Sequence, residues 1–352
     1  MAKNISGIQQ IGVGIPDVKK AWKWYRKNFG LDIPIFQESA EAALMTKYTG
    51  EKVHSRSAVL ALNLQGGGGL EIWQYTSRKP EEVGYDIQLG DLGIFVAQVK
   101  TRNINDALIF FKSEGTQVIS EINKDPAGNE HFFLKDPYGM IFQISKGDEW
   151  FGTGKHATGG ISGCMIGVSD IEKSMALYSG ILDYNKVVYD VTGNFEDLQA
   201  LPGGHATFRR VLLKRTKANT GTFSELLGAG SIELIQITGV KPNKIFKNRY
   251  WGDQGFIHLC FDVQDMSSLK SECENKGFPF TVDSSNTFDM GEAAGHFSYI
   301  EDPDGTLIEF VETHKIPIVK KLGWYLNVKN RNTGKALPKW ILNALSFSRV
   351  KD

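Results

Sequence analysis

The sequence predicts an α+β protein of two tandem domains, and an internal repeat is the main reason. The segment 136–143, DPYGMIFQ, returns at 302–309 as DPDGTLIE. In both copies an Asp-Pro-x-Gly turn lies between two β-like runs, which predicts a hairpin. A chain of 352 residues is long enough for two domains of ordinary size, and 41% hydrophobic residues suffice for packed cores.

A smaller unit repeats inside each half. The apolar run 8–15 is followed by Asp17 and then by 18–29, where apolar residues fall on one face at helical spacing before Gly30. Asp17 is typical of a helix N-cap and Gly30 of a helix end. The same strand-then-helix pattern returns at 93–115, 164–182 and 256–277, and each helix is followed by β-rich runs. The chain therefore predicts four strand–helix–strand–strand–strand (βαβββ) modules, paired into two domains.

These modules set the expected domain boundaries. Residues 1–146 hold the first two modules, the glycine-rich stretch 147–160 is the linker, and 161–314 hold the last two modules. Residues 315–352 form a C-terminal extension. Within it, segment 336–345 has Pro338 near its start and apolar residues on one face, which predicts an amphipathic helix that docks on one domain.

Composition narrows the classes of partner. Lys+Arg and Asp+Glu both number 40, with no long run of one sign, so a nucleic acid or an anionic membrane is disfavoured. Three cysteines without a CxxC motif argue against a disulfide scaffold. The N-terminus lacks the layout of a signal peptide, and no apolar stretch approaches the ~18 residues of a membrane span. We expect a cytoplasmic protein with a small-molecule substrate; association with further copies stays open.

Four such modules, each closing on a strand of the Ile-Glu-Leu type, resemble the vicinal oxygen chelate superfamily over roughly residues 6–313. That superfamily includes glyoxalase I, methylmalonyl-CoA epimerase, extradiol dioxygenases and bleomycin resistance proteins. The resemblance implies that two modules curl into an open, cup-shaped mixed β-sheet. It also implies that metal ligands come from the first and last strands of each module.

The positions that the resemblance assigns to ligands differ between the domains. The second domain offers one imidazole, two carboxylates and a glycine: Gly163, Glu233, His258 and Glu309. The first offers one carboxylate, two amides and a glycine: Gln10, Glu71, Gly93 and Gln143. The resemblance therefore predicts a divalent-metal site on Glu233, His258 and Glu309, and no metal in the first domain.

The residues also give a physical reason for this site. Glu233 and Glu309 lie in strand-like runs with large apolar neighbours, where a carboxylate must be paired, hydrogen-bonded, metal-bound or protonated. Two carboxylates and an imidazole suit Zn²⁺, Mn²⁺, Ni²⁺ or Fe²⁺, and three protein ligands leave positions open for substrate. Gly163 lacks a side chain where many members have His or Gln, so the site is either more open or degenerate.

Three functions follow from the resemblance. The favoured one is a metal-dependent, glyoxalase-like lyase or isomerase that stabilises an enolate, with Glu233 as general base. The second is an Fe(II) extradiol-type dioxygenase that cleaves a catechol. Tyr299 precedes Glu309 at the spacing of that branch's active-site tyrosine, and His296 is a candidate acid or base, although that branch uses two histidines and one carboxylate. The third is a non-catalytic small-molecule binding protein of the resistance type.

Overall fold

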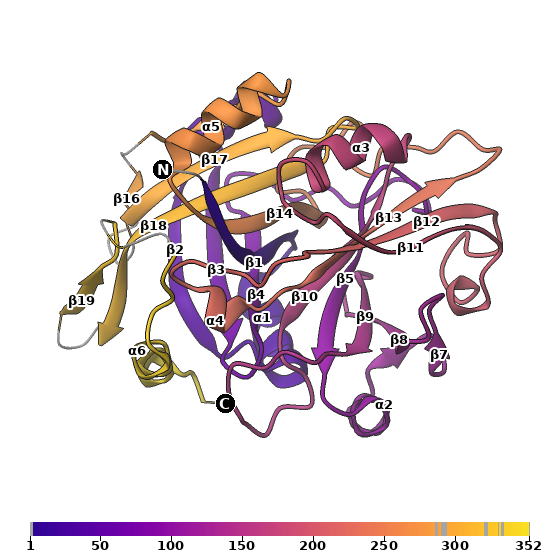
Figure 1. Cartoon of the computed structure of the whole chain (residues 1–352), viewed down its shortest axis with the longest axis horizontal. Coiled ribbons are helices and arrows are strands. Elements are labelled where there is room, and N and C mark those ends of the chain that lie inside the picture. Colours follow the sequence, from indigo (N-terminus) through magenta and orange to yellow (C-terminus); the bar gives the residue numbers. More distant parts are fainter. Residues whose placement is uncertain are drawn as a thin grey trace.

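The structure is a computed structural model that describes residues 3–285, 288–289, 294–319, 323–329, 331 and 334–351. Four βαβββ modules follow one another along the chain, so the predicted α+β fold class is confirmed (Figure 1). The first repeat comprises β1 (Asn4–Gly14), α1 (Val18–Phe29), β2 (Ile33–Glu41), β3 (Ser55–Asn63), β4 (Gly67–Tyr75), β5 (Gly93–Thr101), α2 (Ile104–Ser113), β6 (Gln117–Val118), β7 (Asn123–Lys124), β8 (Glu130–Lys135) and β9 (Ile141–Lys146).

The second repeat has the same order of strands and main helices, with one additional short helix at Ser224–Leu227. It comprises β10 (Ile161–Gly167), α3 (Ile171–Tyr178), β11 (Lys186–Gly193), β12 (Phe208–Lys214), α4 (Ser224–Leu227), β13 (Ser231–Ile237), β14 (Gly255–Gln264), α5 (Met266–Asn275), β15 (Val282–Asp283), β16 (Phe288–Asp289), β17 (Ala294–Glu301) and β18 (Leu307–Val319). Short 3-10 helices lie at Ala43–Tyr48 and Glu196–Leu198. None of the helices in the described ranges has the length and apolar character that crossing a membrane requires.

The helix caps and the Asp-Pro-x-Gly turns form as the sequence predicts. The Asp17 carboxylate accepts hydrogen bonds from the backbone N–H groups of Lys19 and Lys20 at 3.1 and 3.0 Å, and Gly30 ends α1 with a φ of 63°. In each Asp-Pro-x-Gly turn the aspartate accepts two backbone N–H groups. The two aspartates also accept a tyrosine hydroxyl from the preceding module's helix: Tyr25 to Asp136 at 2.5 Å and Tyr178 to Asp302 at 2.9 Å. These bonds tie together the two modules of each repeat.

The β-sheet, by contrast, pairs modules from different repeats. β1 pairs in parallel with β4 and antiparallel with β14, which in turn pairs in parallel with β18. This first half of the sheet therefore combines the first and fourth modules; in Figure 1 the indigo β1 lies beside orange strands of the fourth. The second half combines the other two modules, because β10 pairs with β13 and, at Ile161, with β5. The resemblance had suggested cups built from consecutive modules, and the strand pairing corrects this.

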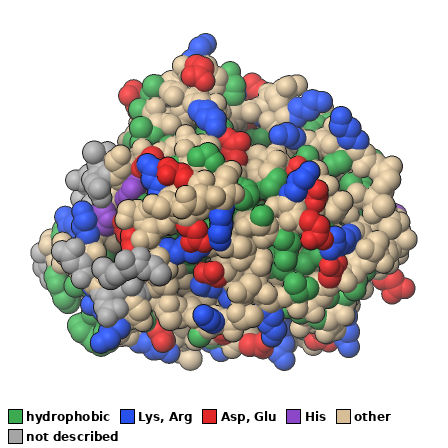
Figure 2. All heavy atoms as spheres, turned by 45° about the horizontal axis from the view of Figure 1, so that its top comes forward, with side chains coloured by type: hydrophobic (Ala, Val, Ile, Leu, Met, Phe, Trp, Pro, Cys, Tyr) green, Lys and Arg blue, Asp and Glu red, His purple; other side chains and the backbone are tan. Residues whose placement is uncertain are grey.

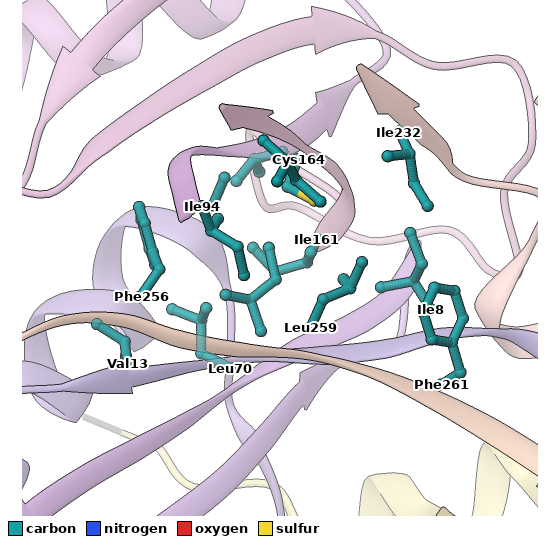
Figure 3. Close-up of a cluster of buried hydrophobic side chains, with 14 of the residues drawn as sticks. Ile8, Val13, Leu70, Ile94, Ile161, Cys164, Ile232, Phe256, Leu259 and Phe261 are labelled. Atoms are coloured by element: carbon teal, nitrogen blue, oxygen red, sulfur yellow. The ribbon is translucent and has the colours of Figure 1, made fainter. Parts of the chain in front are cut away.

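A dry apolar interior joins the two halves. Figure 3 shows Ile8, Leu70 and Leu259 from the first half near Ile161 and Ile232 from the second. All five side chains are buried, and burial stabilises by about 25 cal/mol per Å² of apolar surface. The outer surface differs in kind: on the face in Figure 2, basic and acidic side chains are interspersed, as expected from the balanced composition.

The C-terminal extension docks on the first half. After β19 (Trp324–Asn327) it forms α6 (Lys339–Asn343) and a 3-10 helix at Ala344–Ser348. The helical part begins one residue after Pro338, later than the predicted 336, because the residue before a proline is disfavoured in helical conformation and Pro338 itself is the N-cap with ψ 138°. Leu342 and Leu345 are buried, and the Leu337 N–H donates to the Thr222 carbonyl at 2.9 Å.

One buried carboxyl makes the stability of the fold depend on pH. Burial raises the pKa of Asp262, on β14, from 3.8 to about 8; a hydrogen bond with Ser6 lowers it and the charge of Glu312 raises it. The folded protein thus keeps a proton that the unfolded chain loses near pH 4. The free energy of unfolding therefore falls as pH rises from about 4 through about 8, because the unfolded chain releases this proton before the folded protein does.

Asp262→Asn removes this proton linkage. We expect the variant's free energy of unfolding, relative to the wild type, to rise between pH 5 and pH 8 by up to about 4 kcal/mol. Urea unfolding of both proteins at the two pH values measures the difference. A difference that is the same at pH 5 and pH 8 would contradict the raised pKa.

Candidate metal centre

Four buried polar side chains meet in the first half of the sheet: Gln10 on β1, Glu71 on β4, His258 on β14 and Glu309 on β18. Nε2 of His258 lies 3.3 Å from Oε2 of Glu71 and 3.2 Å from Oε2 of Glu309. Nε2 of Gln10 donates to Oε2 of Glu309 at 3.3 Å. One ligand atom from each carboxylate and from the imidazole lie within 4.8 Å of one another. The four side chains thus form one compact donor set.

Strand register and a glycine make this convergence possible. Gly12 of β1 lies opposite His258 on one side and opposite Glu71 on the other. A Cβ atom at Gly12 would lie 2.4 Å from Cε1 of His258 and 2.5 Å from its Nε2, far inside van der Waals contact. The absence of a side chain at position 12 therefore leaves room for the imidazole between the two carboxylates.

Burial and mutual charge set the protonation of the cluster. Burial raises the pKa of Glu309, and the charge of Glu71 adds to this effect, so the pKa lies above its ordinary value despite His258. Burial also acts on Glu71, but the hydrogen bond and charge of His258 outweigh it and lower the pKa. For His258, burial lowers the pKa, and the two glutamates more than reverse this. The imidazole and the two carboxylates are thus strongly interacting groups in a water-poor site.

The donor set fits a divalent cation. Oε1 of Gln10 is buried and has no hydrogen-bond partner among the described residues, and the buried Nε2 of His258 lies between the two carboxylates. Unpartnered buried polar atoms are costly, and these lie beside two carboxylates. Nitrogen and oxygen donors together suit a borderline ion such as Zn²⁺, Mn²⁺, Ni²⁺ or Fe²⁺. A divalent ion would satisfy these atoms and offset the charge of both glutamates.

The structure does not bring Glu233 to this cluster. Its Oε1 accepts hydrogen bonds from the Tyr189 hydroxyl and from Nε of Arg210, both at 2.7 Å. Arg210 also donates to both oxygens of Asp197, at 2.8 and 3.0 Å, and all four side chains are buried. In place of Glu233, Glu71 of the first repeat lies beside His258 and Glu309, because β4 and β13 belong to different halves of the sheet.

The second half of the sheet lacks the donors of the first. Gly163 occupies the register position that corresponds to Gln10, and a Cβ there would lie 2.1 Å from the Ser231 carbonyl oxygen. Gln98 lies opposite Gln143 in the pairing of β5 with β9, as Cys260 lies opposite Glu309 in the pairing of β14 with β18. Val96 lies two residues before Gln98 and therefore corresponds to His258, which lies two residues before Cys260. The resemblance had assigned the position that corresponds to His258 to Gly93, three residues before Val96. With no imidazole there and no space at 163, the buried Arg210 serves as the partner of Glu233 instead.

The two further catalytic candidates lie on opposite faces of β17. The Tyr299 hydroxyl is 3.5 Å from Nδ1 of His258, and Tyr299 pairs in register with Glu309. His296 faces the other way, where its Nε2 lies 2.6 Å from Oδ1 of Asp283. Alternation along the strand explains the difference, since positions 296 and 299 have opposite parity. The structure therefore brings Tyr299, but not His296, to the cluster.

A cavity of about 350 Å³ opens beside the cluster. Gln10, Glu71, Glu309 and Tyr299 line it, and most of its remaining wall is aromatic or aliphatic. Sequence reasoning missed this role of Gln10 and Glu71. Gly12 and Gln10 lie two residues apart and therefore on the same face of β1. The sequence alone does not show that Gly12 lies opposite His258, because this depends on the pairing of β1 with β14.

Comparisons with known proteins agree with this architecture. The family model described as the Glyoxalase/Bleomycin resistance protein/Dioxygenase superfamily matches residues 7–144 and 160–310. The chain therefore belongs to this superfamily, as the sequence analysis predicted. A search of curated protein sequences finds no match to the chain.

Solved structures show the same fold at low sequence identity. Glyoxalase I from Zea mays has a TM-score of 0.52 and 14% identity, over 88% of this chain and 92% of that chain. A candidate dioxygenase from Bacillus subtilis subsp. subtilis str. 168 has a TM-score of 0.54 and 14% identity, over 88% and 86%. At this identity the likeness establishes the fold alone.

Proposed function

We propose that the protein is a divalent-metal-dependent enzyme that moves a proton on a small substrate with two adjacent oxygens, as a glyoxalase-like lyase or isomerase. The observation that carries the proposal is the meeting of Gln10, Glu71, His258 and Glu309 at one end of an apolar cavity. These four residues would hold the ion. When bound, it would supply Lewis-acid stabilisation of the negative charge that develops on a substrate oxygen as a neighbouring C–H bond ionises.

We assign the general base to Glu309, a role first expected of Glu233. Burial and the charge of Glu71 raise the pKa of Glu309 above its ordinary value, and Gln10 donates to its Oε2. The charge of His258 acts on both glutamates, whereas that of Arg56 acts on Glu71 and favours its anionic form. Glu309 can therefore take a proton from a substrate carbon, while Glu71 remains an anionic ligand.

The donor set favours this reaction class over ring cleavage. Non-haem Fe(II) oxygenases typically use two histidines and one carboxylate, whereas this cluster has one histidine and two carboxylates. His296, the candidate acid or base of the dioxygenase hypothesis, pairs with Asp283 away from the cluster. Tyr299 remains the single observation in favour of that alternative, which predicts dioxygen uptake by the Fe²⁺-loaded protein with a catechol. A resistance-type binding protein would neither bind metal nor move a proton.

Exchange of a carbon-bound proton with solvent tests the proposal. Metal-loaded protein is incubated in D₂O with a panel of α-hydroxyketones, and loss of the α-proton signal is followed by ¹H NMR. We expect the wild type to catalyse exchange and Glu309→Gln to lower its rate by about 10²–10³, because a general base contributes on this order. Both proteins are assayed at saturating metal, so that weaker metal affinity does not account for the loss.

Glu312→Gln is the matched control. Glu312 lies on the same strand, but its carboxylate accepts the backbone N–H of Asp265 at 2.7 Å and does not line the cavity. We expect its exchange rate to equal that of the wild type. Undiminished exchange in Glu309→Gln would show the base assignment to be wrong, and catechol-dependent dioxygen uptake would favour the dioxygenase instead.

A further inference from the structure

We infer that the substrate of this site is an uncharged molecule with a large apolar body, and that Arg56 donates a hydrogen bond to one of its oxygens. The inference rests on the proposed function and adds the substrate class and one substrate-binding residue. Three properties of the cavity support it: the chemistry of its wall, the balance of its charges and one unpartnered guanidinium nitrogen.

The wall of the cavity is mostly apolar. Its described lining residues include Phe36, Leu62, Trp73, Phe223, Trp251 and Leu345. These side chains come from both repeats and from the C-terminal extension. A ligand that fills a volume of about 350 Å³ next to the cluster therefore has to replace water mostly with carbon contacts.

The charges of the described lining residues leave no cation for an anionic substrate. Four carboxylates line the cavity, Glu38, Glu41, Glu71 and Glu309, beside the single guanidinium of Arg56. Nη2 of Arg56 already lies 2.5 Å from Oε1 of Glu38. A divalent ion would balance Glu71 and Glu309, and Glu41 is exposed to solvent. An anion in this cavity would lose its hydration without gaining a free opposite charge, so a neutral substrate is favoured.

Arg56 still has a donor to offer. Its Nη1 is buried without a hydrogen-bond partner among the described residues, and its side chain is only 12% exposed. A guanidinium stays charged and carries five N–H donors in a fixed plane. Arg56 lines the same cavity as Glu71 and Glu309 of the cluster. A ligand oxygen that accepts from Nη1 would satisfy this atom and fix the orientation of the ligand relative to the cluster.

The C-terminal extension also contributes to the wall of the cavity. Leu345 and Ile316 line the cavity, and both lie beyond residue 310, where the match to the family model ends. Leu345 belongs to the docked 3-10 helix at Ala344–Ser348 and is buried. The C-terminal extension thus adds apolar surface to the cavity, in keeping with an apolar body that points away from the cluster.

The test compares two ligands that share one metal-binding head. Both 2-hydroxy-4′-methylacetophenone and 4-(2-hydroxyacetyl)benzoate carry adjacent carbonyl and hydroxyl oxygens, but only the second has a carboxylate at the far end of the ring. Isothermal titration into Zn²⁺-loaded protein gives both affinities. We expect the neutral ketone to bind at least about tenfold more tightly, since the carboxylate would be desolvated without a partner.

Variants of Arg56 test the hydrogen bond. We expect the double variant Arg56→Met/Glu38→Gln, which leaves no unpaired buried carboxylate, to bind the neutral ketone about tenfold more weakly and to keep its metal. Arg209→Met is the control, because Arg209 pairs with Asp190 and Glu172 outside the cavity. Tighter or equal binding of the benzoate, unchanged affinity in the double variant, or binding of neither ligand would overturn the inference.

The same samples separate this inference from the proposed function. Elemental analysis of each protein reports whether the wild type holds an ion at all. A wild type without metal contradicts the proposed function, whereas a metal-loaded protein that prefers the benzoate contradicts only the substrate class.

Discussion

His258→Ala is expected to reduce the bound divalent ion from about one per chain to a trace. His258 supplies the imidazole nitrogen of the donor set, with Nε2 at 3.3 and 3.2 Å from the two carboxylates. Its removal leaves Glu71 and Glu309 to repel each other across an enlarged space. Changes to residues that merely support metal ligands cost 10–100-fold in affinity, so loss of a ligand should cost at least about 100-fold. Elemental analysis after dialysis against a weak chelator measures the change.

Glu233→Gln is the informative comparison for this experiment. The sequence alone assigned Glu233 to the metal, whereas the structure pairs it with Arg210 and Tyr189. We therefore expect Glu233→Gln to retain its metal. Equal metal content in the wild type and His258→Ala would refute the site, and loss of metal in Glu233→Gln would restore the ligand set inferred from the sequence.

Arg210→Met is expected to destabilise the fold by about 3–5 kcal/mol, because it leaves buried carboxylates without a counter-charge. Arg210 binds both Glu233 and Asp197 and is itself 0% exposed. Burial lowers the pKa of its guanidinium, but the charge of Glu233 outweighs this and raises the pKa well above the ordinary value. The guanidinium therefore stays charged at every ordinary pH. The free energy of unfolding, measured with urea at pH 7, gives the loss.

The neighbouring arginine provides the control for this measurement. Arg209 points to the opposite face of β12 and pairs with Asp190 and Glu172, where solvent reaches all three side chains. Arg209→Met should cost about 1 kcal/mol or less, as surface ion pairs do. A similarly small cost for Arg210→Met would show that the buried network contributes little to the second half of the sheet.

The sequence predicted the modules well because their signals are local. Asp17 and Gly30 bound α1 as expected, and the turns at Asp136 and Asp302 take the predicted form. A cap or a tight turn is decided by neighbouring residues and their backbone angles. Such features can be read from one segment without knowing what packs against it.

The partners of each strand could not be read in this way. Glu71 and Glu233 lie in nearly the same context, Leu-Glu-Ile and Ile-Glu-Leu, and only the neighbouring strands distinguish them. β12 has the sequence FRRVLLK with two adjacent arginines, and only the structure shows that Arg210 is the buried one. A buried guanidinium requires a carboxylate partner, which here is Glu233, while Glu71 lies beside His258.

The crossed pairing of modules also has a consequence for how such a chain can arise. Each repeat supplies half of the donor set: Gln10 and Glu71 come before the linker, His258 and Glu309 after it. Two separate copies of one repeat, paired in the same way, would form a symmetric dimer with two equivalent sites at its interface. Covalent fusion allows the two interfaces to differ, and here one carries the converging donors whereas the other carries a buried ion-pair network around Arg210. Joining the halves thus gives every molecule one complete donor set, independent of protein concentration.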